Sequence, residues 1–303
     1  MVVMAPYNYA KGYCIHLSDG NSWWITGYED SIKYTDLFAD IMCLKECLPD
    51  KYPKFIFFNS SDSYQLDESA IKSILCDSDT EWKSHKYDFG NVWHGAQSSD
   101  VIVEYKSQEP SKDDKFMAMW ISLCFIYQKC LKTGALPIHG GFAEYKGKGV
   151  LFPAPGGTGK STTCRRLPPP WKALCDDENL IIPNKNSQFQ VHPFPTWSDY
   201  LCDRGNHKWD TQRAIPLSAI FFLDRSENDE VIRLSPDKTP IYMTGSSYQV
   251  LAKVIIRMSK DEQSMIMHQA FNNAFDILKA VPIYQLKISL TGKFWEKVEE
   301  VLG

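Results

Sequence analysis

The stretch Ala154-Pro-Gly-Gly-Thr-Gly-Lys-Ser161, which follows the apolar run Gly149-Val-Leu-Phe152, decides how this chain is expected to fold. An apolar run, a glycine-rich turn and a Gly-Lys-Ser that opens a helix are typical of the phosphate-binding loop of nucleotide enzymes. Glycines let backbone N–H groups turn toward phosphate oxygens, and the N-terminus of the helix adds a partial positive charge. The sequence therefore predicts an α/β domain that binds a nucleotide at this loop.

Each polar residue of the loop has a predicted task. Lys160 can reach the β- and γ-phosphates of ATP, and the Ser161 hydroxyl can ligate Mg²⁺. Ala154 replaces the glycine that begins the usual pattern, which costs little where the backbone φ is negative. The alternative is an ordinary strand-to-helix turn with a surface lysine. The predicted nucleotide-binding residues are Pro155, Gly156, Gly157, Thr158, Gly159, Lys160, Ser161 and Thr162.

The composition excludes some classes of function. Of the 303 residues, 44% are hydrophobic and 23% charged, which is ordinary for a globular protein with a filled core. The net charge of -4 gives no basic surface for nucleic acid. Residues 1–8 lack the pattern of a signal peptide, and the apolar segment 116–127 is too short to cross a bilayer. We therefore expect a cytoplasmic protein that binds neither nucleic acid nor membrane.

The cysteines also indicate a cytoplasmic protein. Nine are present, an odd number with no Cys-x-x-Cys pair. No zinc-ligand spacing occurs among them. They are therefore expected to be free thiols, as in a reducing cytosol. They are Cys14, Cys43, Cys47, Cys76, Cys124, Cys130, Cys164, Cys175 and Cys202.

Periodicity and breaker residues divide the chain into two predicted domains. Residues 1–110 are expected to form a mixed α/β region, for docking or as a scaffold, and residues 112–303 the domain of the phosphate-binding loop. The polar segment 107–114, which contains a proline, is the predicted boundary. Strands are predicted at 12–17, 22–26, 55–58, 101–105, 149–152, 172–182, 188–192, 218–223 and 283–288, and helices at 35–44, 115–132, 160–167, 247–258, 261–280 and 294–302.

Paired carboxylates, Asp176 and Asp177, interrupt the apolar strand predicted at 172–182. Carboxylates in such a place are costly unless they have partners. In phosphoryl transfer they can ligate Mg²⁺ and accept the proton of an attacking hydroxyl. Because side chains alternate along a strand, the two are expected to point in different directions and to divide these tasks. The alternative is a solvated strand end.

His139-Gly140, a hairpin, the phosphate-binding loop and Leu174-Cys-Asp-Asp177 follow one another along the chain. In this order the chain resembles the catalytic domain of HPr kinase/phosphorylase, over about residues 112–303 and most closely over 136–182. HPr kinase/phosphorylase and ATP-dependent PEP carboxykinase belong to one superfamily. Within this superfamily the chain looks most like HPr-kinase-related proteins encoded in peptide-modification clusters. Examples are the SynChlorMet cassette protein ScmC and the lasso-precursor kinases. These share the Ala-Pro-x-Gly-x-Gly-Lys-Ser-Thr form of the loop.

This resemblance implies a P-loop kinase fold and a role for each site residue. Lys160 and Ser161 would hold the phosphates and Mg²⁺. Asp176 would be the catalytic base that takes the proton from a substrate hydroxyl, and Asp177 would assist at the metal. His139 would lie beside the reaction centre.

Two segments depart from the family pattern. Residues 192–198 stand where the family has a metal-binding glutamate, and residues 244–247 stand where it has an arginine. A cation for the transferring phosphoryl group must then come from elsewhere, and the candidates are Arg204, Arg213 and Arg257. The segment 193–198, with Trp197, is a candidate substrate-facing loop, although a loop aromatic is more often packed.

The predicted function is therefore an ATP- and Mg²⁺-dependent kinase that acts on a hydroxyl. A serine or threonine of a ribosomally made precursor peptide is the favoured acceptor, and HPr is not expected as the substrate. One alternative is a kinase for a small molecule such as free serine. The other is a regulatory subunit that binds nucleotide without transferring phosphate. A homo-oligomer is compatible with the resemblance, because HPr kinases form hexamers.

Overall fold

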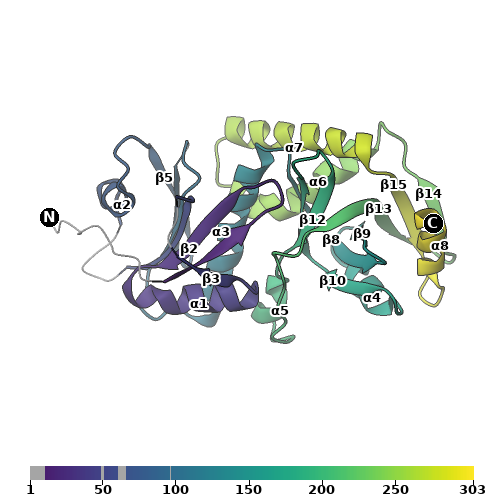
Figure 1. Cartoon of the computed structure of the whole chain (residues 1–303), viewed down its shortest axis with the longest axis horizontal. Coiled ribbons are helices and arrows are strands. Elements are labelled where there is room, and N and C mark those ends of the chain that lie inside the picture. Colours follow the sequence, from purple (N-terminus) through teal and green to yellow (C-terminus); the bar gives the residue numbers. More distant parts are fainter. Residues whose placement is uncertain (1–10, 49–50, 61–65, 96) are drawn as a thin grey trace. The chain divides into compact units, whose positions relative to one another are not determined.

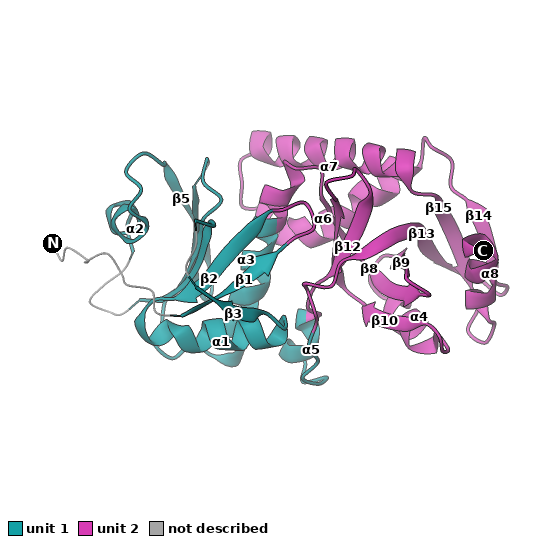
Figure 2. Ribbon diagram, viewed as in Figure 1, with its two compact units in different colours: residues 1–16, 21–126, 197–208 teal, residues 17–20, 127–196, 209–303 magenta. Residues whose placement is uncertain are grey.

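The computed structural model describes residues 11–48, 51–60, 66–95 and 97–303, so the expectation about residues 1–8 lies outside the described residues. The chain is α/β with two mixed sheets, as predicted (Figure 1). Two compact units are interleaved along the sequence, and Figure 2 colours them separately. Unit 1 comprises residues 1–16, 21–126 and 197–208, and unit 2 comprises residues 17–20, 127–196 and 209–303. The predicted domains 1–110 and 112–303 stay a prediction.

Unit 1 contains a seven-stranded sheet in the order β3-β1-β2-β4-β7-β6-β5. Its strands are β1 (Gly12–His16), β2 (Ser22–Gly27), β3 (Lys45–Cys47), β4 (Lys54–Asn59), β5 (Trp82–Tyr87), β6 (Gly90–Gly95) and β7 (Val101–Tyr105). Its helices are α1 (Ile32–Ile41), α2 (Glu68–Leu75) and α5 (Trp197–Leu201), with a 3-10 turn at Glu29–Ser31. The division between the units falls within α3 (Lys112–Leu131).

Alternation along β4 builds the core of unit 1. Phe55 and Phe57 point to one face, where their ring centroids lie 5.4 and 5.5 Å from that of Phe38 on α1. Ile56 and Phe58 point to the other face and join the apolar cluster of α2. The strand is parallel to both of its neighbours, β2 and β7. A strand buried on both faces reads as a continuous apolar run, which is why its position was predictable.

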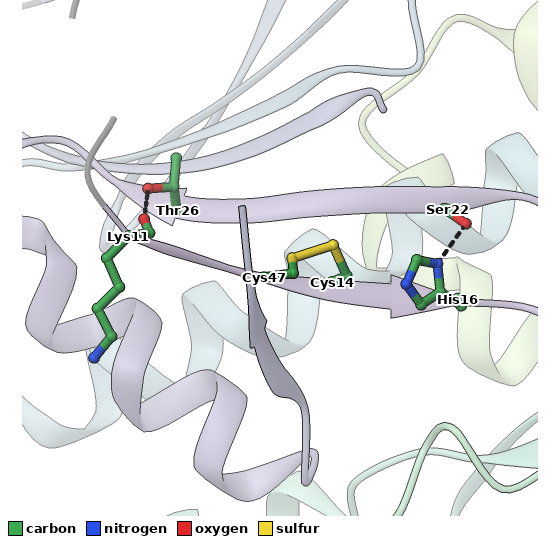
Figure 3. The surroundings of a disulfide bond; sticks show 6 residues. All are labelled: Lys11, Cys14, His16, Ser22, Thr26 and Cys47. Carbon is green, nitrogen blue, oxygen red and sulfur yellow. Dashed lines mark hydrogen bonds between the residues drawn. A yellow bond between two sulfur atoms is a disulfide. The ribbon is translucent and has the colours of Figure 1, made fainter. Parts of the chain in front are cut away.

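Two cysteines of unit 1 correct the expectation of free thiols. Cys14 on β1 and Cys47 on β3 form a disulfide (Figure 3), while the other seven cysteines are not disulfide-bonded. The two are 33 residues apart in the sequence. They meet because β3 pairs antiparallel with β1, with Glu46 opposite Tyr13. Sequence spacing carries no trace of that pairing.

The sheet of unit 1 also encloses a carboxylate. Glu104, on β7, is 2% exposed. It accepts four hydrogen bonds, from the Ser60 hydroxyl, the Leu66 backbone N–H (2.9 Å), the Asn91 amide (2.8 Å) and the Trp93 indole (2.9 Å). These donors replace the water that the carboxylate loses on burial. Glu104 therefore ties β6 and the chain on both sides of residues 61–65 to one strand.

Replacing Glu104 by alanine is expected to lower the thermal unfolding midpoint of the whole chain. Four donors, two of them fully buried, would lose their acceptor, a loss that costs about 3 kcal/mol or more. Circular dichroism during heating measures the midpoint. The matched control is Glu109→Ala, because Glu109 pairs with Lys33 at exposed positions and should contribute little. Equal midpoints for the two variants would contradict the assignment.

Unit 2 contains an eight-stranded sheet. Its strands are β8 (Leu136–Tyr145), β9 (Lys148–Pro153), β10 (Lys172–Cys175), β11 (Glu178–Pro183), β12 (Phe189–Pro193), β13 (Ile215–Arg225), β14 (Glu230–Arg233) and β15 (Ile283–Ile288). The main order is β10-β8-β11-β12-β13-β15-β14, and β9 pairs with both β8 and β13. The helices are α4 (Lys160–Arg166), α6 (Thr239–Ile255), α7 (Lys260–Ala280) and α8 (Phe294–Leu302).

Strand β13 is the centre of the core of unit 2. Ala219, Phe221 and Leu223 belong to one apolar cluster with Phe294 and Val298 of α8. The intervening Phe222 contacts the ring of Tyr242 on α6, with centroids 5.3 Å apart. Helix α6 packs in turn against β8 and α7. The predicted strand at 218–223 is thus confirmed as a strand buried on both faces.

Several element boundaries differ from the predictions, including the following three. The strand predicted at 172–182 is divided into β10 and β11 by Asp176 and Asp177. Helix α3 begins at Lys112, inside the segment predicted as a boundary, and α6 begins at Thr239, eight residues before the predicted start. Among the described residues, no helix is long and apolar enough to span a membrane.

Candidate active site

The loop between β9 and α4, predicted to bind phosphate, contains two glycines with positive φ angles. Gly157 has φ 76° and Gly159, at the start of α4, has φ 116°. Glycine adopts these angles without the strain that a side chain would bring. A Cβ atom built on Gly156, Gly157 or Gly159 would meet nothing within 4 Å. The space beside these three glycines is therefore open.

Lys160 lies inside this loop. Its side chain is largely buried, and Nζ donates to the carbonyl oxygens of Ala154 (3.0 Å) and Pro155 (3.2 Å). Burial lowers the pKa of the ammonium, while the charges of Asp177 and Asp176 act in the opposite direction. Both carboxylates are thus close enough to influence the loop lysine. A phosphate oxygen in the loop would compete with the two carbonyls for the ammonium.

Strand β8 brings the carboxylates to the loop. Residues 136–139 of β8 pair with β11, whereas its residues 142–144 pair with β10. Asp176 and Asp177 occupy the bend where the chain changes from β10 to β11. The Gly140 N–H donates to the Asp177 carbonyl at 2.7 Å and holds the bend against β8. Both predicted acids therefore lie beside His139-Gly140.

The two carboxylates have different partners, as expected of groups with different tasks. Asp176 Oδ1 accepts a hydrogen bond from the Thr196 hydroxyl at 2.7 Å. Asp177 Oδ1 lies 3.0 Å from His139 Nε2, and both of these side chains are partly exposed. The structure thus brings together His139, Asp176, Asp177 and Lys160. Thr196 was not predicted, because nothing in its sequence context marks it as a partner of Asp176.

Helix α6 holds His139 from the other side. Its ring Nδ1 lies 2.7 Å from Gln249 Oε1, and an amide oxygen can only accept, so Nδ1 donates. The Ser246 hydroxyl accepts from the His139 N–H and donates to the His139 carbonyl, each at 3.1 Å. Ring and backbone are both fixed. Such support is typical of residues that must keep one orientation during a reaction.

A stripe along α6 faces this region. Tyr242, Ser246, Gln249 and Lys253 are spaced four, three and four residues apart, which places them on one side of a helix. Lys253 contacts the buried Glu178 at 3.3 Å, next to the carboxylate bend. The stripe was not predicted, although its spacing is visible in the sequence. It was missed because the helix was expected to begin at residue 247.

Arg225, at the end of β13, contacts the loop directly. Its guanidinium donates to the carbonyls of Gly157 and, at 3.3 Å, of Thr158. Arg213, one of the predicted candidates, forms an ion pair with Glu144. The other two candidates are Arg204, in unit 1, and Arg257, which follows the end of α6. Arg225, which was not among the candidates, is an arginine in direct contact with the loop between β9 and α4.

The candidate substrate-facing loop is wrong. Residues 193–197 are buried, and Trp197 stacks on Phe38 within unit 1, with ring centroids 6.0 Å apart. His192, next to this segment, is also buried, and burial lowers the pKa of its imidazole. Its Nδ1 lies 2.8 Å from the Thr211 carbonyl. The segment is a packed part of the fold, and Thr196 is the part of it that contacts the candidate site.

The carboxylate oxygens of Asp176 and Asp177 are of the type that could hold Mg²⁺ together with the phosphates of a nucleotide. Among the described residues, no three His, Cys, Asp or Glu side chains converge as a metal site. Mg²⁺ is commonly held by one or two carboxylates together with substrate phosphates, rather than by protein ligands alone. Two carboxylates beside the loop satisfy that requirement. The metal roles of Ser161 and Asp177 stay predictions.

Comparison with known proteins identifies one family over the C-terminal part of the chain. The family model of the SynChlorMet cassette protein ScmC matches residues 101–303, about two thirds of the chain. This range contains the loop, the carboxylate bend, His139 and helix α6. No curated protein matches the chain.

Arg225→Ala is expected to weaken ATP binding by about tenfold, because the loop would lose charge-assisted hydrogen bonds to two of its carbonyls. Lys160→Ala should weaken it further, since it removes the ammonium that reaches the phosphates. Isothermal titration with ATP and Mg²⁺ measures both. Arg233→Ala, an exposed arginine on β14, is the matched control. Unchanged affinity in both site variants would contradict nucleotide binding at this loop.

Proposed function

We propose that this chain, which belongs to the family of the SynChlorMet cassette protein ScmC, is an ATP- and Mg²⁺-dependent kinase. Its acceptor is a hydroxyl of a serine or threonine in a ribosomally made precursor peptide. The proposal includes a P-loop fold of the HPr kinase type for unit 2. Strand β9, its loop and α4, with the parallel neighbour β13, support that fold. The cytoplasmic location and the homo-oligomer remain predictions.

One observation carries the proposal. Two carboxylates with different partners lie at the bend that the Gly140 N–H holds, and the next residue, Gly141, lies against Lys160 and Cys164 of α4. A site that only binds nucleotide needs the loop and its lysine. Such a site does not need a second carboxylate, nor a histidine that α6 holds at three atoms. They are the parts that a transfer reaction requires.

The residues of this chain divide the work of transfer. Bound ATP and Mg²⁺ supply the phosphoryl group and neutralise its charge. Lys160 and the loop N–H groups hold the phosphates. Asp176 accepts the proton of the attacking hydroxyl, whose oxygen forms the new P–O bond as the bond to the ADP oxygen breaks. Thr196 donates to one oxygen of Asp176 and so fixes its direction.

The partners of the two acids support this assignment. Asp177 faces His139 Nε2, and Gln249 of α6 holds the ring of that histidine. Asp176 has a different partner, the hydroxyl of Thr196. His139 therefore acts as a positioning residue for Asp177, through the contacts that α6 provides.

Asp176→Asn is expected to abolish transfer, by at least about a hundredfold, because an amide cannot take the proton. Its affinity for ATP should change little. The assay is transfer from γ-labelled ATP to precursor peptides encoded beside the gene and to free hydroxy amino acids. Full activity of Asp176→Asn would overturn the base assignment. Label on a free amino acid alone would favour the small-molecule kinase, and binding of ATP without any transfer would favour the regulatory subunit.

Gln249→Leu is expected to lower kcat about tenfold or more while the KM for ATP stays nearly constant, because His139 loses the acceptor that orients its ring. Gln249→Glu should restore much of the rate, since a carboxylate oxygen also accepts from Nδ1. Both rates are followed across pH 6–9. Equal losses in the two variants at every pH would show that Gln249 serves only packing.

A further inference from the structure

We propose that an apolar pocket beside the loop holds a large apolar side chain next to the accepting hydroxyl of the peptide. The pocket has a volume of about 310 Å³ and lies entirely within unit 2. Its apolar walls are Ala154, Pro155, Phe222, Leu223, Ile241 and Tyr242. The proposal rests on the kinase function and adds the class of residue that the kinase selects beside its acceptor.

The position of the pocket assigns it to the acceptor. Two of its walls, Ala154 and Pro155, supply the carbonyls that bind the Lys160 ammonium. That ammonium is the group that reaches the β- and γ-phosphates. Two further lining residues, Ser246 and Gln249, are the ones that hold His139. The pocket is therefore between the γ-phosphate end of the loop and the support of the His139–Asp177 pair.

The walls determine the chemistry of the occupant. Among the described residues, none that lines the pocket carries a charge. A phosphate, or the ammonium and carboxylate of free serine, would lose water there without gaining a charged partner. An aliphatic or aromatic side chain has no charged group that would lose its water on entering the pocket, and burial of its apolar surface is favourable. The pocket therefore favours a peptide over a free amino acid.

The exposure of two walls supports an occupant from outside the chain. Ile241 is 66% exposed and Tyr242 is 46% exposed, although both are large apolar residues at the mouth of a pocket. Pockets that enclose whole ligands generally have volumes from about 300 Å³ upward, so this one is at the lower limit. It has room for a single large side chain. We expect leucine or phenylalanine, one residue before or after the accepting serine or threonine.

Gly245 allows the pocket to be filled without damage to the fold. It lines the pocket on α6, and a Cβ atom built on it would meet nothing within 4 Å. Its φ is not in the left-handed region. A larger residue in a helix also has a better helix propensity than glycine. Gly245→Leu therefore blocks the space while the helix is kept.

The experiment measures peptide binding with ADP and Mg²⁺ present, by fluorescence anisotropy. The probes are blocked alanine-based heptapeptides with a central alanine in place of serine, flanked by leucine, phenylalanine, alanine or aspartate. The wild-type chain should bind the leucine and phenylalanine peptides at least about tenfold more tightly than the alanine peptide. Gly245→Leu should remove this preference. Tyr248→Leu, at an exposed position of the same helix outside the pocket, should retain it.

Other outcomes have distinct meanings. Equal binding of all four peptides by the wild-type chain would overturn the proposal. A preference that survives in Gly245→Leu would place the apolar contact elsewhere and would also overturn it. Weaker ATP binding in Gly245→Leu, with peptide preference unchanged, would assign the pocket to the nucleotide base instead.

Transfer is measured separately with the serine forms of the same peptides. An apolar preference in binding without any transfer would sustain the pocket and reject the kinase function. Transfer that is equal for every flanking residue would sustain the kinase function and reject the pocket. The two proposals can therefore fail independently.

Discussion

The candidate site depends on the close approach of β8 to β9 and α4 at Gly140-Gly141. A Cβ atom on Gly140 would come within 2.9 Å of the Pro153 backbone, and one on Gly141 within 2.6 Å of the Cys164 sulfur on α4. Larger residues would push β8 away from the helix that begins with Lys160. His139 directly precedes these glycines, and the Gly140 N–H donates to the Asp177 carbonyl at the carboxylate bend. The small size of the two glycines therefore sets the distances among Lys160, the two aspartates and His139.

Helix α6 then holds His139 and the residue after the carboxylate bend in fixed positions. Ser246 holds the backbone of His139, Gln249 holds its ring, and Lys253 contacts the buried Glu178 after the bend. The segment 244–247, which stands where the family that the chain resembles has an arginine, thus has another use. It contributes Ser246 to the histidine and Gly245 to the apolar pocket. The arginine that contacts the loop between β9 and α4 comes from β13, as Arg225.

Prediction from sequence succeeded where periodicity was strong and failed where tertiary contacts decided. The strands at 55–58, 101–105 and 218–223 were found because burial on both faces leaves a continuous apolar run. The start of α6 was missed because Pro240 and Gly245 look like helix breakers. Proline is tolerated in the first turn of a helix, where its missing N–H has no partner to lose. Gly245 is kept within the helix at an exposed position.

The α/β class, the glycines between β9 and α4, and the order of histidine, hairpin, loop and paired acids can all be read from the sequence alone. These are local properties, since backbone angles and hydrophobic periodicity depend on near neighbours. Only the tertiary structure decided the partners of the acids, the Arg225 contact, the packing of Trp197 and the Cys14–Cys47 disulfide. Gln249 lies 110 residues from His139, and Arg225 lies 68 from Gly157. Over such separations, only the pairing of strands and the packing of helices determine which side chains meet.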